Sequence, residues 1–319
     1  VRSRPPPTYR PWWPRCRNSL QALGLTDAHC RLTAGVRRLG SMLLPCAGHA
    51  AVPAGTALAV DRDLFSSEVH AKLSAHPLIR IVREEATELP TPGILATGPL
   101  TSAQLGSSIS ARLGTRSLAF FDAIAPIVAA ESLDHERLYA LSRYGKGGGD
   151  DYLNAPMDAG EYDAFISALV TADQFHGPDF GAGAQSDGGL PRVGMARGGP
   201  QTLRCGPMKP VGLPDPRTGR EPHAVVQLGR EDRDGQMWNL VGFQTRMKIP
   251  EQKRVFATIP GLTAAEYLRF GSIHRNAYIN SPATLGEALT ARDDDRLFFA
   301  GQLTGVEGYT ESLGTGPLA

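Results

Sequence analysis

The sequence feature that most constrains the possible fold of this chain is its last segment, where residues 297–316 read LFFAGQLTGVEGYTESLGTG. It opens with a short apolar run, LFFA, that has the character of a buried strand. A glycine-dense turn follows, with Gly301, Gly305 and Gly308, and leads into a helix-like run. A strand, a glycine-rich turn and a helix in this order point backbone N–H groups at an anionic ligand. A tight turn that binds nothing is the alternative for a glycine pattern taken alone.

Length and composition are those of a globular protein. A chain of 319 residues predicts two domains, or one large domain with an insertion. Its hydrophobic content of 41% supplies a packed core, and no run of about 18 apolar residues predicts a membrane span. Four cysteines without CxxC spacing predict neither a zinc site nor a disulfide scaffold. No signal-peptide pattern opens the sequence, and we expect a cytoplasmic protein.

Charge is spread unevenly along the chain. Residues 1–38 hold eight arginines against one acid, Asp27, although the net charge of the whole chain is only +1. A basic end of this kind suits a polyanion such as RNA. A solvated tail is the alternative for this segment.

Several other elements can be predicted from local residues. Residues 57–60 predict a buried strand, and Asp61 predicts an N-cap for a helix with Phe65, Val69 and Leu73 on one face. Further strands are expected at 78–82 and 94–96, and a β-hairpin at 224–245 around Asp234 and Gly235. Helices are expected as a long stretch at 25–44, as an amphipathic helix at 162–170 and as a helix that starts at Pro250. Residues 173–201 predict a loop.

Long motifs carry a resemblance to a known family. They read VPAGTALAVDR at 52–62, ATGPLTS at 96–102, GPMKPVGLPDPRTGREPHAVVQL at 206–228 and AGQLTGVEGYTES near the end. This sequence resembles the folate- and FAD-dependent tRNA uracil C5-methyltransferases and, more loosely, the GidA-type tRNA uridine modifiers. The resemblance runs from about residue 16 to residue 316 and is broken at 28–36 and 173–201.

The resemblance implies an α/β fold of the FAD-dependent dinucleotide-binding type, Rossmann-like and similar to glutathione reductase. Residues 1–105 and 290–319 would form a partial FAD-binding domain, and 106–289 an inserted α+β domain for folate and tRNA. The implied reaction forms 5-methyluridine at position 54 in the T-loop of tRNA. It uses FAD, 5,10-methylenetetrahydrofolate and NADPH or NADH as reductant. We expect a monomer that binds the T-arm of tRNA, has no metal site and does not associate with a membrane.

The implied chemistry needs a thiolate that adds to C6 of the uracil and a flavin that supplies reducing equivalents. Cys16, in CRNSL, matches one of the family's two cysteines and is the expected catalytic residue; a small buried hydrophobe is the alternative. The expected cofactor contacts are Asp61, Arg62, Thr97, Gly98, His274, Arg275, Asn276, Gly301, Gln302, Gly305, Glu307, Gly308 and Tyr309. Among these His274 is expected to stack near the folate or flavin ring, while Lys209, Arg217 and Arg275 are candidate anion contacts.

The chain departs from the family pattern in three ways. No GxGxxG opens it, nothing follows the C-terminal motif, and Gly189 stands where the family's second cysteine is expected. The chain looks clipped at both ends. We therefore expect weak or no FAD retention and methylation that is absent or very slow. Two alternatives stay open: a GidA-like modifier of wobble uridine, which VEGY in place of TTGY disfavours, and an impaired homologue that only binds RNA.

Overall fold

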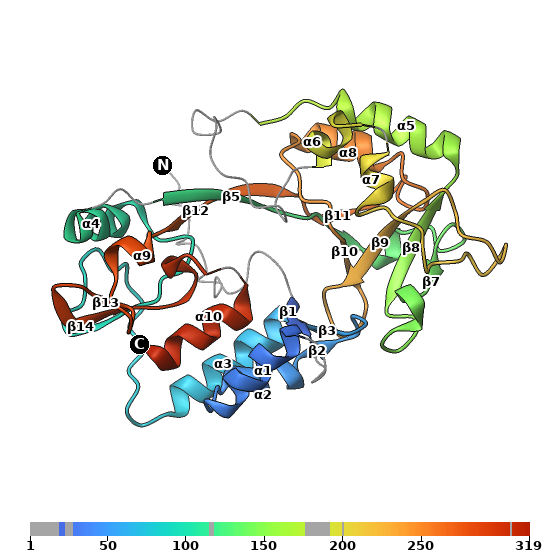
Figure 1. The fold of residues 1–319 in the computed structure, drawn as a ribbon. Helices are drawn as coiled ribbons and strands as arrows, with labels where there is room; N and C mark the ends of the chain where they lie inside the picture. The colour runs from blue at the N-terminus through green and yellow to red at the C-terminus, as the bar shows by residue number, and fades with distance from the viewer. Residues whose placement is uncertain (1–18, 23–27, 115–117, 176–191, 200, 307) are drawn as a thin grey trace, which may run out of the picture.

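The computed structural model describes residues 19–22, 28–114, 118–175, 192–199, 201–306 and 308–319. Cys16, Gly189 and Glu307 lie outside the described residues. For His274 and Arg275 the structure describes the backbone alone. The described elements form two groups joined by a long two-stranded ribbon (Figure 1). We call residues 19–114 with 279–319 the terminal lobe and residues 125–271 the central lobe.

The first part of the terminal lobe pairs a small sheet with three helices. Its elements are β1 (Ser19–Ala22), α1 (Ala28–Arg38), α2 (Leu43–His49), β2 (Ala51–Val52), β3 (Ala57–Val60) and α3 (Arg62–Ala75). The strands are antiparallel in the order β1-β3-β2. Phe65 of α3 is buried against Leu58 and Cys46, and Tyr309 and Leu313 from the far end of the chain pack on the same cluster. Residues from both ends of the sequence therefore share one core.

The second part of the terminal lobe holds the strand and turn with which the sequence ends. Its elements are β4 (Gly93–Leu95), α4 (Ala103–Leu113), α9 (Ser281–Thr284), β13 (Thr290–Ala291), β14 (Asp294–Phe299), η3 (Gly301–Thr304), α10 (Tyr309–Thr315) and η4 (Gly316–Leu318). The strand order is β13-β14-β4, and β14 runs parallel to β4 with Leu297 opposite Gly93 and Phe299 opposite Leu95. Their hydrophobic core also combines residues that are far apart in the sequence, because Leu105 and Ile109 of α4 pack with Leu297 and Phe299.

The central lobe is built around a six-stranded antiparallel sheet in the order β11-β6-β10-β9-β8-β7. The strands are β6 (Ile127–Ala129), β7 (Tyr139–Ala140), β8 (Tyr152–Met157), β9 (Ala224–Arg230), β10 (Met237–Leu240) and β11 (Tyr267–Arg269). The helices are η1 (Ala130–Ser132), η2 (Arg143–Gly145), α5 (Ala159–Val170), α6 (Arg192–Arg197), α7 (Thr202–Cys205) and α8 (Ile249–Phe256). Helices α5 to α8 gather beside the sheet (Figure 1), and Phe165, Phe243 and Phe256 meet edge to face in the core between them.

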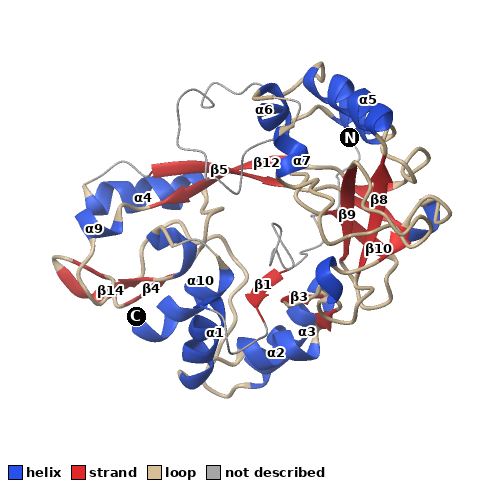
Figure 2. Cartoon of the chain, turned by 45° about the vertical axis from the view of Figure 1, so that its right-hand side comes forward, coloured by secondary structure: helices blue, strands red, loops and turns tan. Residues whose placement is uncertain are grey.

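The ribbon that joins the lobes consists of β5 (Leu118–Ile124) and β12 (Ser272–Tyr278). They pair antiparallel over their whole length, from Leu118 opposite Tyr278 to Ile124 opposite Ser272. Both views show this ribbon running from one lobe to the other (Figures 1 and 2). The chain thus leaves the terminal lobe once, folds the central lobe and returns beside its outgoing strand.

A second contact between the lobes, which we call the lobe joint, is made by polar groups. The Asp151 carboxylate accepts hydrogen bonds from the backbone N–H of Gly55 at 2.6 Å and of Gly148 at 3.2 Å. The Tyr152 hydroxyl donates to the carbonyl of Ala54 at 3.0 Å. Asp151 is only 5% exposed, so these donors offset the cost of burying its carboxylate. The joint fixes the turn before β3 to the loop before β8.

Most locally encoded elements are confirmed. The strand at 57–60 is β3, and the Asp61 carboxylate caps α3 by accepting from the N–H groups of Asp63 and Leu64. The amphipathic helix is α5, the hairpin is β9 and β10 around a left-handed Gly235, and Pro250 lies in the first turn of α8. The long helical stretch is divided into α1 and α2, because Gly40 adopts a left-handed φ of 77° between them.

One predicted strand is wrong. Residues 78–82 form no strand, and Leu78 is 88% exposed. Their β-branched and apolar residues favour extended backbone, but a strand also needs a neighbour to hydrogen-bond. Within the described part of the chain no strand lies beside them. Among the described helices, none is long and apolar enough to cross a membrane.

Candidate functional site

The candidate site is organised by the parallel pair β4 and β14. Because the two strands run in the same direction, their carboxyl ends lie side by side, and the N–H of Ala300 donates to the carbonyl of Leu95 at 2.9 Å. The turn beginning at Ala96 and the turn beginning at Gly301 therefore start from neighbouring positions. In open α/β sheets, ligands bind in the crevice outside such carboxyl ends.

The turn after β4 is held by its own hydroxyl groups. Gly98 has a left-handed φ of 71°, which an L side chain rarely adopts. The Thr101 hydroxyl donates to the carbonyl of Gly98 at 2.9 Å and lies 2.7 Å from the Thr97 hydroxyl. Ser102 then caps α4 by accepting from the N–H of Leu105. Thr97 and Gly98 are thus fixed in a short, half-buried turn.

The turn after β14 is richer in glycine. Gly301, Gly305 and Gly308 all have a left-handed φ, of 72°, 88° and 89°. The N–H of Gly301 donates to the Thr315 hydroxyl at 2.6 Å, so the turn is tied to the end of α10. A Cβ on Gly305 would lie 3.3 Å from the ring of Tyr278, so glycine permits a close approach to β12 there. Gln302 is half-buried in η3.

A third segment, the end of β12, reaches both turns. The N–H of Ala277 donates to the carbonyl of Pro99 at 2.8 Å, and that of Ile279 donates to the carbonyl of Leu303 at 2.9 Å. The preceding Asn276 is fully buried, yet neither its amide nitrogen nor its amide oxygen has a hydrogen-bond partner among the residues that the structure describes. A buried amide without partners is costly unless something else satisfies it. A polar ligand at this junction would supply the missing partners.

These contacts bring together most of the residues expected to hold the cofactor. Thr97, Gly98, Asn276, Gly301, Gln302, Gly305, Gly308 and Tyr309 belong to three segments that contact one another. The backbone of His274 and Arg275 precedes Asn276 on the same strand. Because Asn276 lies where these segments meet, the residues present fit a flavin bound across the two turns.

Asp61 and Arg62 lie elsewhere, at the start of α3, and have other partners. Besides capping the helix, the Asp61 carboxylate accepts from the N–H of Arg233 at 3.3 Å. Arg62 forms an ion pair with Glu231 of the central lobe at 2.8 Å. Burial raises the pKa of the Glu231 carboxyl, and the Arg62 guanidinium opposes that rise. Both side chains therefore hold the two lobes together in this structure.

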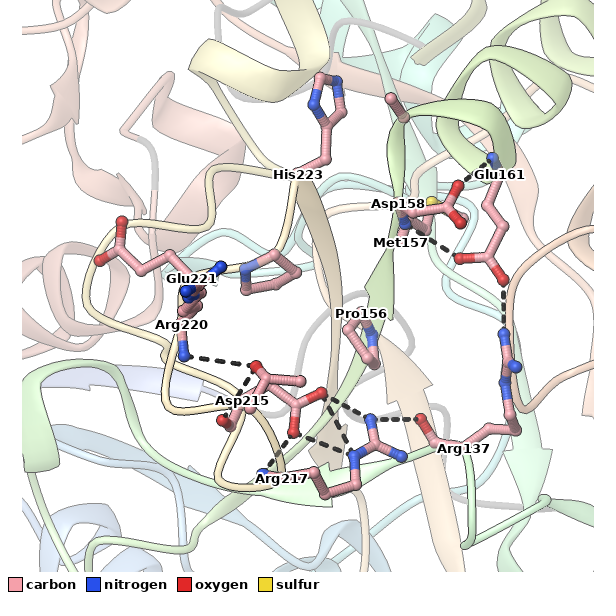
Figure 3. A pocket seen from close by; sticks show the side chains of 13 residues that line it. Arg137, Pro156, Met157, Asp158, Glu161, Asp215, Arg217, Arg220, Glu221 and His223 are labelled. Carbon is pink, nitrogen blue, oxygen red and sulfur yellow. Dashed lines mark hydrogen bonds and ion pairs between the residues drawn. The ribbon is translucent and has the colours of Figure 1, made fainter.

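Sequence reasoning missed a pocket of about 560 Å³ in the central lobe (Figure 3). It lies between the start of α5 and the loop before β9. Its lining includes Arg137, Asp158, Glu161, Asp215, Arg217, Arg220, Glu221 and His223. Most of these charges are paired: Arg217 binds the Asp215 carboxylate at 2.7 Å and the carbonyl of Glu136 at 2.6 Å. Arg217, a candidate anion contact, is thus occupied in fixing its own loop.

Comparison with known proteins defines the class of this chain. A family model described as Glucose inhibited division protein A matches residues 13–319, and the chain belongs to this GidA family. Solved structures of Aquifex aeolicus GidA in crystal forms II and I have TM-scores of 0.66 and 0.65 at 13% and 15% identity. These likenesses cover 95% of this chain but only 56% and 58% of those chains, so this chain spans little more than half of the GidA structures it matches.

Within the family, several curated relatives with the same name are similar to this chain in sequence. Methylenetetrahydrofolate--tRNA-(uracil-5-)-methyltransferase TrmFO of Geobacter sulfurreducens is 54% identical over 306 residues, covering 95% of this chain and 70% of the relative. The protein of the same name from Citrifermentans bemidjiense is 52% identical with the same coverage, and that of Anaeromyxobacter dehalogenans is 52% identical over 308 residues. The sequence is therefore much closer to TrmFO proteins than to the structurally similar GidA chains.

Proposed function

We propose that this chain carries the methylenetetrahydrofolate-dependent methylation of a tRNA uracil at C5, with FAD as its flavin. The identity of 51% to 54% with TrmFO proteins supports this activity. The structural observation that carries the proposal is the junction of the turns after β4 and β14 with β12, where the buried Asn276 amide has no partner in the described part of the chain. An FAD-binding fold of the Rossmann type places its cofactor at such strand ends.

The chain's own residues have distinct proposed tasks. Bound flavin supplies the reducing equivalents. The backbone at Gly98 and Gly301 would approach it closely, because these positions have no side chain and the space beside them is open. The Asn276 amide donates to and accepts from a polar edge of the ligand. The Cys16 thiolate adds to C6 of the uracil, which makes C5 nucleophilic.

We also propose a division of labour between the lobes. The terminal lobe, built from both ends of the sequence, binds the flavin. The central lobe is an insertion that serves folate and the T-arm of tRNA. The separate hydrophobic cores of the lobes support this division, since the central core contains only residues between 128 and 262. The boundaries expected at residues 106 and 289 lie just outside the ribbon strands, before β5 and after β12. The protein acts as a monomer.

The decisive experiment is a single-turnover assay with protein in excess over a T-arm transcript. Labelled methylenetetrahydrofolate, FAD and NADPH are supplied, and label in the RNA is measured. We expect incorporation that requires FAD and disappears in Cys16→Ser. Gly189 at the second cysteine position predicts a low rate, which protein in excess compensates. No label above a protein-free control would refute the methyltransferase.

The same assay separates the alternatives. An impaired homologue would bind the transcript with strong salt dependence but transfer no label. A wobble-uridine modifier would label or alter a transcript of the anticodon arm rather than the T-arm. Asn276→Leu gives an independent measure of the site, because FAD affinity measured by flavin fluorescence should fall while Asn280→Leu, on an exposed residue nearby, should leave it unchanged.

A further inference from the structure

One loop of the central lobe presents an aromatic ring in an unusual way. Tyr144 has a left-handed backbone, with φ 58° and ψ 25°, and its residue is 63% exposed. Among the described residues, only Leu289 is another non-glycine residue with positive φ. Bulky residues avoid this conformation, and strained residues cluster at sites of function. Burial of the ring does not explain why this strained backbone is kept, since most of the residue faces solvent.

The loop is held firmly to the segment 209–212. The N–H of Tyr144 donates to the carbonyl of Gly212 at 3.1 Å, and a Cβ on Gly212 would collide with the tyrosine ring. The Arg143 guanidinium donates to the carbonyls of Val211 and of Lys209, the latter at 2.9 Å. The ring is therefore a fixed, preorganised surface, which lowers the entropic cost of using it for binding.

A lysine occurs on each of the two segments. Lys146 and Lys209 are exposed, and no ion pair joins either to another described residue. Two of the nearby carboxylates are turned onto backbone N–H groups: Asp151 accepts from Gly148, and Glu221 accepts from Gly212 at 2.7 Å. Asp150 is the exposed acid of the loop. The available side chains are thus one aromatic ring and one exposed lysine on each of the two segments that hold it.

An exposed aromatic ring flanked by cations suits an unpaired nucleotide, since bases stack on the ring and phosphates meet the cations. We propose that the loop of residues 143–150 is an RNA contact, in which Tyr144 stacks on an unpaired base while Lys146 and Lys209 bind flanking phosphates. The proposal rests on the proposed function for the identity of the RNA as a tRNA T-arm. Because Gly147 packs against Gly55, this contact lies beside the lobe joint.

The test measures binding of a fluorescent T-arm hairpin by anisotropy at about 50 and 200 mM salt. Tyr144→Ala should weaken binding roughly tenfold, and Tyr144→Phe by less than about twofold, because phenylalanine keeps the stacking face. Lys146→Ala and Lys209→Ala should each lower the salt slope by about one. The matched controls are Phe175→Ala, which removes another ring that is 56% exposed, and Lys248→Ala; neither should change the affinity.

Tyr144→Gly separates binding from folding. Glycine adopts the left-handed backbone without strain, so this variant should unfold at the same or a higher urea concentration while binding RNA as weakly as Tyr144→Ala. If the wild-type chain binds the hairpin and all Tyr144 variants bind equally well, this proposal is wrong and the proposed function survives. If binding depends on Tyr144 but no label is transferred, the contact stands and the methyltransferase fails. A wild-type chain that binds no RNA refutes both.

Discussion

Replacing Asp151 should weaken the attachment of the two lobes. Its carboxylate is 5% exposed and accepts from the N–H of Gly55 in one lobe and of Gly148 in the other. Hydrogen bonds to charged groups contribute about 1.5–3 kcal/mol each, and the 3.2 Å bond to Gly148 is the weaker. Since Asp151→Ala also removes the cost of burying a charge, we expect the free energy of unfolding to fall by about 2–4 kcal/mol. Asp151→Asn keeps one acceptor oxygen and should lose about 1 kcal/mol.

Urea unfolding followed by tryptophan fluorescence and by circular dichroism provides the measurement. The neighbouring Asp150→Ala is the matched control, because it removes an exposed carboxylate with no backbone donor described for it and should shift stability by less than about 0.5 kcal/mol. If the loss is confined to the joint, the two probes should also separate in Asp151→Ala as the lobes unfold independently. Equal unfolding midpoints for the alanine variants at 150 and 151 would refute the role given to this carboxylate.

Three further outcomes are expected. The Arg217 guanidinium lowers the pKa of the Asp215 carboxyl in the folded protein. The stability that this ion pair contributes is therefore full above the unfolded pKa of about 3.9 and is lost as pH falls through the lowered folded pKa. The difference in urea midpoint between wild type and Asp215→Asn should be constant above about pH 5 and should shrink below about pH 4. Asp158→Ala removes a capping box at the start of α5 and should cost about 1 kcal/mol in the same unfolding assay, whereas an unchanged midpoint would show that the cap is dispensable. Deleting residues 1–15 should lower both the affinity for tRNA and its salt slope, and identical binding would show that the basic segment does not contact RNA.

Elements that depend on adjacent residues could be predicted from the sequence, because their causes are local. The strand at 57–60 and the cap at Asp61 depend on a few adjacent residues, and so does the apolar face of α5. The strand predicted at 78–82 failed because residue preferences do not reveal whether a neighbouring strand exists.

The candidate site could be predicted only in part. Glycine and polar residues in the two turns indicated a binding region, and the resemblance added Asn276, but no local pattern places that residue between the two turns. Arg62 is expected at the cofactor, and the structure pairs it with Glu231, a residue far along the chain that no local pattern connects to it. The pocket beside α5 and the ring of Tyr144 likewise depend on contacts between distant loops. Such pairings are set by tertiary packing, which periodicity and spacing do not encode.

The parallel pairing of β4 with β14 also sets an order of assembly. Leu95 and Phe299 must meet across roughly 200 intervening residues, and closing so long a loop is slow unless the intervening chain is already compact. The central lobe has a core of its own, so during synthesis it can fold as soon as it has left the ribosome. The strand at Gly93–Leu95 must wait, with Leu95 still unburied, until Phe299 has been added. A chain whose synthesis stops before that point would have a folded central lobe and would lack the proposed flavin site.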